Sequence, residues 1–225
     1  MSTVESKGEM SIKWKEEELL LLPEKCIFSK TTESLLIADP HFGKAAHFRK
    51  SGVPIPENVH VHDFLKLQQL INQYNPKHVY FLGDLFHSDF NSSWDDLETF
   101  LDYFQDITFH LIKGNHDILP DVIYRSGKWQ VYDSSLKVGG LLLSHEPLSS
   151  VPEGVLNLCG HIHPGIRLKG MGRQSLTLAC FFLSKNQMIL PAFGRFTGLA
   201  TMKAKSGDLA YVVTGKKVIA VDFME

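Results

Sequence analysis

The chain of 225 residues lacks the features that define several classes of protein. It has no run of about 20 apolar residues, so we expect no membrane-spanning helix. Residues 1–18 are charged and contain no apolar core of the kind that a secretory signal peptide needs. The formal net charge is only -2, which argues against a protein that coats nucleic acid but allows a local phosphate-binding patch.

Cysteine is scarce and does not occur at metal-ligand spacing. The three cysteines are Cys26, Cys159 and Cys180, and two of them stand inside apolar runs. An odd number of isolated cysteines in apolar surroundings is typical of buried, reduced thiols. We therefore expect a soluble protein of a reducing compartment, the cytoplasm.

No internal repeat and no linker-like composition divides the chain, so we expect a disordered tail over 1–11 and a single domain over 12–225. In the first half, apolar runs alternate with helical patterns at 58–74 and from Ser93 onward. This alternation is typical of βαβ units with parallel strands. Beyond Trp129 the pattern changes to short strands separated by turns. We predict an α/β fold in which two sheets pack face to face with helices outside.

Five segments each join a short apolar run to a potential metal ligand at its end. They are residues 35–41, 79–84, 111–117, 141–145 and 156–163. Apolar runs that stop at a turn signal are typical of strands buried on both faces. Ligand sites of open α/β sheets lie beyond the carboxyl ends of such strands. Five segments of this kind predict one site built from Asp, Asn and His.

The residue types at these ends indicate a pair of metal ions. The candidate ligands are carboxylates, an amide and imidazoles, namely Asp39, His41, Asp84, Asn115, His145, His161 and His163. Mixed ligation of this kind suits Mn²⁺, Fe or Zn²⁺ better than Mg²⁺, which prefers oxygen alone. Two such ions roughly 3.5–4 Å apart activate a bridging hydroxide and stabilise the attacking and leaving oxygens of an in-line displacement at phosphorus.

In this order, the motifs Asp-x-His, Gly-Asp-x-x-His, Gly-Asn-His-Asp, His and Gly-His-x-His resemble the calcineurin-like metallophosphoesterase superfamily. The resemblance implies a four-layer α/β/β/α sandwich of two mixed sheets flanked by helices. It also implies two metal sites that share Asp84, one with Asp39, His41 and His163, the other with Asn115, His145 and His161. By the same resemblance, His116 contacts the phosphate and assists the leaving oxygen, and Asp117 orients His116.

Longer segments around the motifs are similar to the PdeM family of ligase-associated metallophosphoesterases. These segments are residues 39–44, 48–56 and 191–198. The similarity implies a Mn²⁺-dependent DNA phosphodiesterase or endonuclease that acts in repair beside a DNA ligase and a helicase. It also favours Arg49 and Arg195 as residues on the substrate side. Because small superfamily members often self-associate, a homo-oligomer is a further expectation.

Several alternatives stay open at this point. His87 either meets the leaving group or only supports its loop. A second function keeps the site but changes the substrate to that of a small-molecule phosphatase, pyrophosphatase or cyclic-nucleotide phosphodiesterase. A third is a metal-stabilised docking module, which the basic loop at 44–57 suggests. A degenerate, metal-free relative is disfavoured because no ligand position is missing.

Overall fold

The computed structural model describes residues 8–44, 59–86, 92–125, 129–170, 174–195 and 197–223, which form two β-sheets. The first sheet has seven strands that stand in sequence order. They are β1 (Met10–Trp14), β2 (Glu17–Leu21), β3 (Ile27–Ser29), β4 (Ser34–Ala38), β5 (His78–Leu82), β6 (Thr108–Ile112) and β7 (Trp129–Tyr132). Neighbours from β1 to β4 pair antiparallel and those from β4 to β7 pair parallel, so the sheet is mixed.

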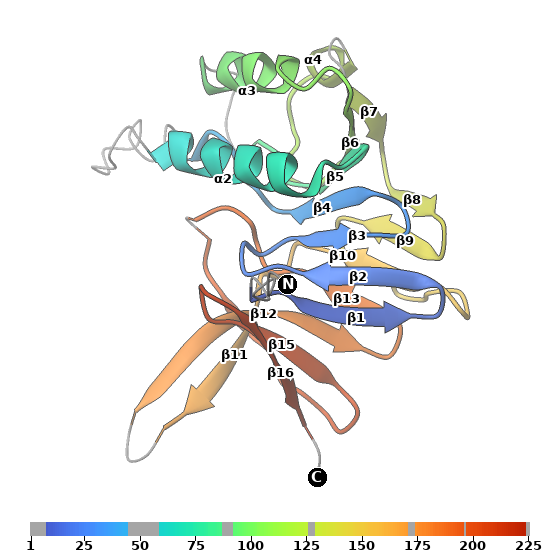
Figure 1. Ribbon diagram of the computed structural model, residues 1–225, viewed down its shortest axis with the longest axis vertical. Coiled ribbons are helices and arrows are strands. Elements are labelled where there is room, and N and C mark those ends of the chain that lie inside the picture. The colour runs from blue at the N-terminus through green and yellow to red at the C-terminus, as the bar shows by residue number, and fades with distance from the viewer. Residues whose placement is uncertain are drawn as a thin grey trace, which may run out of the picture.

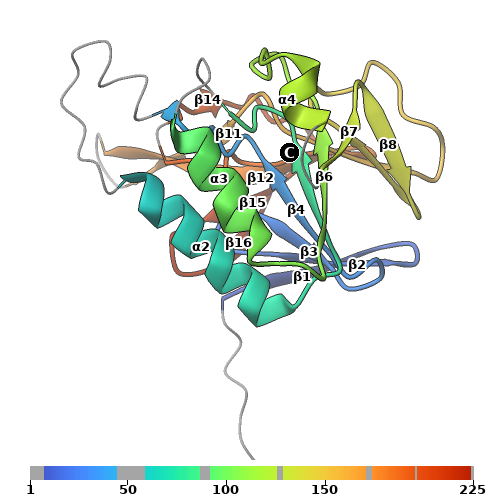
Figure 2. The same cartoon turned by 90° about the horizontal axis from the view of Figure 1, so that it is seen from above.

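Three helices in the described residues cover the first sheet on the side that faces away from the second (Figures 1 and 2). They are α2 (Val59–Tyr74), α3 (Ser92–Asp102) and α4 (Asp121–Arg125). Helix α2 buries Leu67, Leu70 and Ile71 against the sheet, as its apolar periodicity predicts. It ends at Tyr74. The N–H of the next residue, Asn75, still donates to the carbonyl of Ile71, and the left-handed backbone of Asn75 (φ 44°) turns the chain out of the helix.

The second sheet collects the C-terminal half of the chain. Its strands are β8 (Ser135–Val138), β9 (Leu141–Ser144), β10 (Leu156–Cys159), β11 (Pro164–Lys169), β12 (Ser175–Ser184), β13 (Gln187–Ile189), β14 (Ala200–Thr201), β15 (Leu209–Val213) and β16 (Val218–Asp222). Strand β10 pairs parallel with both β9 and β13. The long strand β12 pairs antiparallel with β11, β13 and β15, so this sheet is mixed too.

The two sheets pack face to face over a shared apolar core. Tyr80 of the first sheet and Leu158 and Phe181 of the second belong to one buried cluster. The predicted α/β class with two mixed sheets is confirmed. No described segment after α4 is helical, because the chain there consists of strands joined by turns. The outer face of the second sheet instead carries a small apolar cluster around Phe182 and Val212.

One boundary differs from the sequence prediction. Residues 10 and 11, assigned to a tail, belong to β1, because Met10 and Ile12 pack against the core between the sheets. Residues 1–7 of that tail and 45–57 of the expected basic loop lie outside the described residues. Within the part of the chain that the structure describes, no helix has the length and apolar character needed to span a bilayer.

Candidate metal centre

The carboxyl ends of five strands meet at one edge of the two packed sheets. In the first sheet, Ala38, Leu82 and Ile112 are direct neighbours in the parallel register, so the segments after β4, β5 and β6 leave the sheet side by side. In the second sheet, β9 and β10 are parallel neighbours, and the N–H of Gly160 donates to the carbonyl of His145 at 2.8 Å. The structure therefore brings the five motif segments together.

Three side chains from both sheets form a first group of potential ligands. Asp39, His41 and His163 each offer one ligand atom, and these atoms lie within 4.8 Å of one another. Asp39 Oδ1 is 3.7 Å from His163 Nε2. Asp84 approaches the same group, because its Oδ2 is 4.0 Å from His41 Nε2. These four are the residues that the resemblance assigned to one metal.

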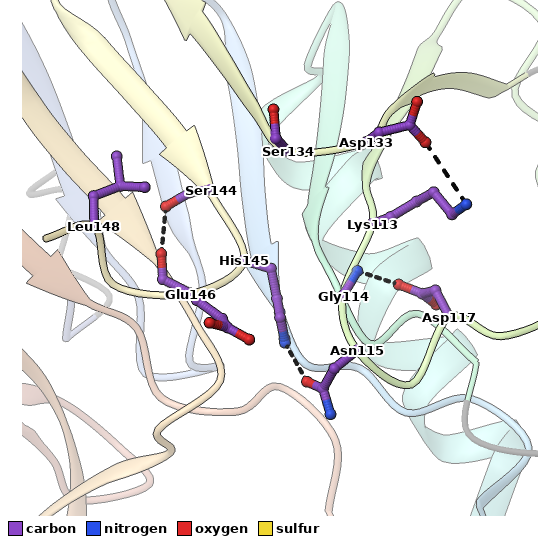
Figure 3. Close-up of a pocket in the computed structure, with 10 residues that line it drawn as sticks. All are labelled: Lys113, Gly114, Asn115, Asp117, Asp133, Ser134, Ser144, His145, Glu146 and Leu148. Carbon is purple, nitrogen blue, oxygen red and sulfur yellow. Dashed lines mark hydrogen bonds and ion pairs between the residues drawn. The ribbon is translucent and has the colours of Figure 1, made fainter.

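A second group has donor atoms that lie closer together. Asn115 Oδ1 is 3.0 Å from His145 Nε2 and 3.0 Å from His161 Nδ1, and the two nitrogens are 3.1 Å apart. Figure 3 shows the contact between His145 and Asn115. Asp84 Oδ1 is 3.5 Å from His145 Nε2. The two oxygens of Asp84 thus face different groups, so this carboxylate could contribute to both.

The ring of His145 is held in one orientation. Its Nδ1 lies 2.9 Å from the carbonyl oxygen of Leu82, and only a protonated nitrogen makes that hydrogen bond. In the neutral ring Nε2 then carries the lone pair and is the nitrogen available to a cation. A backbone carbonyl in this role is common behind metal-binding histidines, where it fixes both tautomer and ring. Asp39 Oδ1 also lies 3.8 Å from Nδ1, but that nitrogen is committed to Leu82.

Five of the candidate ligands have a strained backbone. Positive φ angles occur at Asp39 (50°), His41 (49°), Asp84 (50°), His161 (69°) and His163 (52°). Residues other than glycine rarely adopt this conformation, which costs about 1–3 kcal/mol at each position. Such strain concentrates at functional sites, because only surrounding contacts can maintain it. Half of the ten described non-glycine residues with a positive φ are therefore candidate ligands.

Two glycines leave room for the ligands to converge. A Cβ atom on Gly83 would overlap the ring of His145, and one on Gly114 would overlap the carboxylate of Asp84. Gly83 also has a φ of 76°, which glycine adopts without strain. The glycines of the Gly-Asp and Gly-Asn-His-Asp motifs therefore permit the close approach of the two sheets at the centre.

The donor atoms fit a pair of divalent cations. Among the described residues, Asp39 Oδ1 and His163 Nε2 are buried without a hydrogen-bond partner, a costly state that a cation relieves. The other oxygen of Asp39 accepts the N–H of His161 at 2.9 Å. Carboxylate, amide and imidazole donors together suit Mn²⁺, Fe or Zn²⁺. The cluster is therefore a candidate centre for divalent metals.

Asp117 is buried and connects two of the loops that carry ligands. Its Oδ1 accepts the N–H groups of Leu85 at 3.0 Å and Phe86 at 3.4 Å, and its Oδ2 accepts that of Gly114 at 2.8 Å. Burial raises the pKa of this carboxyl to about 6, against the effect of the N–H donors. These bonds tie the loop after β5 to the loop after β6. The expected role of Asp117, to orient His116, remains a prediction beside this observed one.

His116 stands at the exposed side of the ligand cluster. Its backbone N–H donates to Asp84 Oδ1 at 2.9 Å, and its ring centre lies 6.1 Å from that of His41. Its side chain is exposed, whereas those of Asp84 and His41 are buried. An exposed imidazole beside His41 can meet a substrate that arrives from solvent.

The remaining predicted site residues are less well defined. His87 and Arg49 lie outside the described residues. Arg195 is exposed, and its Nη2 lies 2.6 Å from His62 Nε2 on helix α2. Its backbone is close to the centre, because the preceding N–H, of Gly194, donates to the carbonyl of Asp39 at 3.2 Å. Arg195 thus borders the site while its side chain contacts the helix.

A buried polar network behind His145 was not predicted from the sequence. Asn157 donates to the carbonyl of Leu142 at 2.8 Å and to the hydroxyl of Ser144 at 2.9 Å. The Ser144 hydroxyl in turn donates to the carbonyl of Glu146 at 2.7 Å. The residues on both sides of His145 are therefore anchored. The available signal was Asn157 itself, a polar residue inside an apolar run, which must find partners when buried.

The two mixed sheets bring Asp, Asn and His side chains together at adjacent candidate cation positions. This arrangement is that of a metal-dependent phosphoesterase. The sequence model of the calcineurin-like phosphoesterases matches residues 34–183, and the chain belongs to this family. The matched segment contains every ligand candidate from Asp39 to His163. No curated protein matches the chain in sequence.

Solved structures include one with a closely similar fold. The nuclease MPE from Pseudomonas putida is 24% identical and superposes with a TM-score of 0.77, covering 95% of this chain and 100% of that one. The phosphoesterase Yfce from E. coli is 13% identical over 84% of this chain and 97% of its own, with a TM-score of 0.44. The likeness to Yfce is too weak to support an argument. The likeness to the Pseudomonas putida protein covers both sheets of this chain.

Proposed function

We propose that this protein is a phosphodiesterase that uses two divalent metal ions, Mn²⁺ by preference, to hydrolyse internucleotide bonds of DNA during repair. The observation that carries the proposal is the pair of candidate ligand groups that share Asp84, with the exposed imidazole of His116 beside His41 of the first group. When bound, two such ions neutralise the nonbridging oxygens and activate a water molecule for in-line attack at phosphorus.

The residues of the chain supply the ligands and position the reacting groups. We assign the first ion to Asp39, His41, Asp84 and His163, and the second to Asp84, Asn115, His145 and His161. His116 protonates the leaving oxygen, since an exposed imidazole regains its proton from solvent between turnovers. Asp117 holds the loops of Asp84 and Asn115 at a fixed separation through its three bonds to backbone N–H groups.

The diester and DNA parts of the proposal rest on similarity. The motif segments resemble the PdeM family, and the Pseudomonas putida protein of the same fold is described as a nuclease. On the same ground we propose Arg49 and Arg195 as contacts to the substrate backbone, His87 as a leaving-group residue, and association with a DNA ligase and a helicase. The free, buried cysteines Cys26, Cys159 and Cys180 support a reducing, cytoplasmic setting.

A second candidate function uses the same site on a small molecule, as a phosphatase, pyrophosphatase or cyclic-nucleotide phosphodiesterase. The net charge of -2 favours it, because tight binding of DNA normally uses several phosphate contacts from Lys and Arg. Since both functions share the metal centre, only the choice of substrate separates them.

The first test is hydrolysis of bis-p-nitrophenyl phosphate beside p-nitrophenyl phosphate by the Mn²⁺-reconstituted protein. We expect the diester to be preferred, and His116→Ala to lower kcat by about 10²–10⁴-fold. Bound manganese per protein, measured by mass spectrometry of the metal, should stay at the wild-type value in this variant. A loss of metal from His116→Ala would make His116 a ligand and refute its assigned role.

The ligand variant His163→Ala is the matched control, because it should lose both metal and turnover. A preference for the monoester would support the small-molecule function instead. For DNA itself, turnover of an oligonucleotide should fall steeply with salt if Lys and Arg side chains contact its phosphates. Turnover of DNA that does not change with salt would argue against those contacts.

A further inference from the structure

A hollow of about 450 Å³ lies beside the metal centre. It opens between the end of β6, the turn from β7 to β8 and the segment that follows β9 (Figure 3). The residues that define its walls are Lys113, Asn115, Ser134, His145, Glu146 and Leu148. Asn115 and His145 belong to the ligand cluster as well, so the hollow and the metal centre share a wall. A group bound in the hollow is therefore adjacent to a phosphate held at the centre.

The walls are held in place by interactions within the protein. Lys113 Nζ lies 3.6 Å from Asp133 Oδ1 at the rim (Figure 3). On the opposite side, the Ser144 hydroxyl donates to the carbonyl of Glu146 at 2.7 Å and accepts from Asn157 at 2.9 Å. Ligand pockets are usually formed before the ligand arrives, and these bonds give the hollow that property.

The charges around the hollow favour one class of ligand. Asp117, Asp133 and Glu146 contribute three carboxyl groups, of which that of Asp117 already accepts three backbone N–H groups, whereas Lys113 contributes one ammonium group that already lies beside Asp133. A second phosphate group in the hollow would meet the carboxylate of Glu146 and be repelled. A neutral group that carries O–H and N–H donors is favoured instead, since carboxylates only accept hydrogen bonds. Leu148 adds an apolar surface.

We propose that the hollow binds the nucleoside on one side of the scissile phosphate. This inference rests on the proposed phosphodiesterase function, and it names the substrate as an ester of a nucleoside rather than a phosphoanhydride. The volume of about 450 Å³ lies within the range of about 300–1,000 Å³ that small-ligand sites occupy. The donors of sugar and base meet Glu146 and Ser134, and the face of the base packs on Leu148.

The test compares three chromogenic diesters with the Mn²⁺-loaded enzyme, namely thymidine 5′-(p-nitrophenyl phosphate), its 3′ isomer and bis-p-nitrophenyl phosphate. We expect one thymidine isomer to exceed the bis-ester in kcat/KM by about tenfold or more. The preferred isomer identifies the ester oxygen whose nucleoside enters the hollow. If neither isomer exceeds the bis-ester in kcat/KM, the nucleoside subsite is refuted. The phosphodiesterase function is tested separately, by whether the bis-ester is hydrolysed at all.

Two matched variants locate the effect. Ser134→Phe places a ring in the hollow, and Ser135→Phe adds the same ring at the next position, which is exposed and does not line it. The preference for thymidine over the bis-ester should disappear in Ser134→Phe and persist in Ser135→Phe. Equal preferences in the two variants would overturn the proposal.

Two further measurements keep the test decisive if Ser134→Phe fails to fold. Leu148→Ala should lower the preference for thymidine about threefold or more, through lost apolar contact. Calorimetric titration of the Mn²⁺-loaded protein should show tighter binding of the matching thymidine monophosphate than of inorganic phosphate, and Leu148→Ala should reduce that difference. Equal binding of the two ligands by the wild-type protein would count against the subsite.

Discussion

Helix α2 carries a buried lysine whose charge can be tested separately from catalysis. Lys66 Nζ donates to the carbonyl of Phe193 at 2.7 Å and lies 3.5 Å from the centre of that phenyl ring. It is also 3.7 Å from Asp63 Oδ1, and its side chain is only 16% exposed. Burial lowers the pKa of Lys66 from its ordinary value of 10.5 to about 8, and the attraction of Asp63 only partly offsets this.

The sign of the resulting pH dependence follows from the two pKa values. The folded protein releases the Lys66 proton near pH 8 and the unfolded chain near pH 10.5, so folding becomes more favourable as the pH rises between them. Titration of Lys66 across both pKa values raises the free energy of unfolding by about 3 kcal/mol in all. About 2 kcal/mol of this increase occurs between pH 7 and about pH 9.5. Because a methionine cannot titrate, Lys66→Met should lack this increment.

The assay is urea unfolding of the wild type, Lys66→Met and Lys77→Met at pH 7 and at about pH 9.5. The free energy of unfolding of the wild type minus that of Lys66→Met should rise by about 2 kcal/mol over this range. The Lys77 side chain is 68% exposed, so the same difference for Lys77→Met should change by less than about 0.5 kcal/mol. A difference for Lys66 that does not change with pH would refute the reasoning.

Three further predictions concern Gly114 beside Asp84, the hydrogen bonds of the buried Asn157, and the three cysteines. Gly114→Ala should weaken Mn²⁺ binding about 10–100-fold in a calorimetric titration, because the new Cβ displaces the carboxylate of Asp84, a proposed ligand, and wild-type affinity would contradict the overlap. Asn157→Leu should lower the free energy of unfolding by about 1–3 kcal/mol in urea, and an unchanged midpoint would contradict the network. Burial raises the pKa of Cys26, Cys159 and Cys180, so a thiol reagent at pH 8 should label them only after unfolding, and rapid labelling of the native protein would be the opposing result.

The strands that carry the site were predictable because strands buried on both faces consist mainly of apolar residues. The strands ending at Ala38, Leu82 and Ile112 consist mainly of apolar residues, and each is followed by a polar residue or a glycine that begins a loop. Two helical crossovers between these strands make them parallel, so their ends had to meet at one edge. The fold class and the meeting of the candidate ligands follow from these local patterns.

The supports behind the candidate ligands were not predictable, because many of them are backbone groups. The carbonyl of Leu82 orients His145, and the N–H groups of Leu85 and Phe86 bind Asp117, yet any residue offers these groups. The hollow beside the centre is similarly hidden, since it arises where the turn between β7 and β8 comes to lie beside Glu146. Such features depend on the distance between chain segments and not on residue type.

The strained backbone of the candidate ligands is stabilised by hydrogen bonds from backbone N–H groups to the carboxylates at the centre. Each left-handed ligand costs about 1–3 kcal/mol. Five backbone N–H groups donate to carboxylates at the centre, three of them to Asp117, one from His161 to Asp39 and one from His116 to Asp84. Hydrogen bonds to a charged group contribute about 1.5–3 kcal/mol each, the same order as the strain. The carboxylates therefore hold the loops in a conformation that the loops would not keep alone, and Asp117 is needed for this even apart from any action on His116.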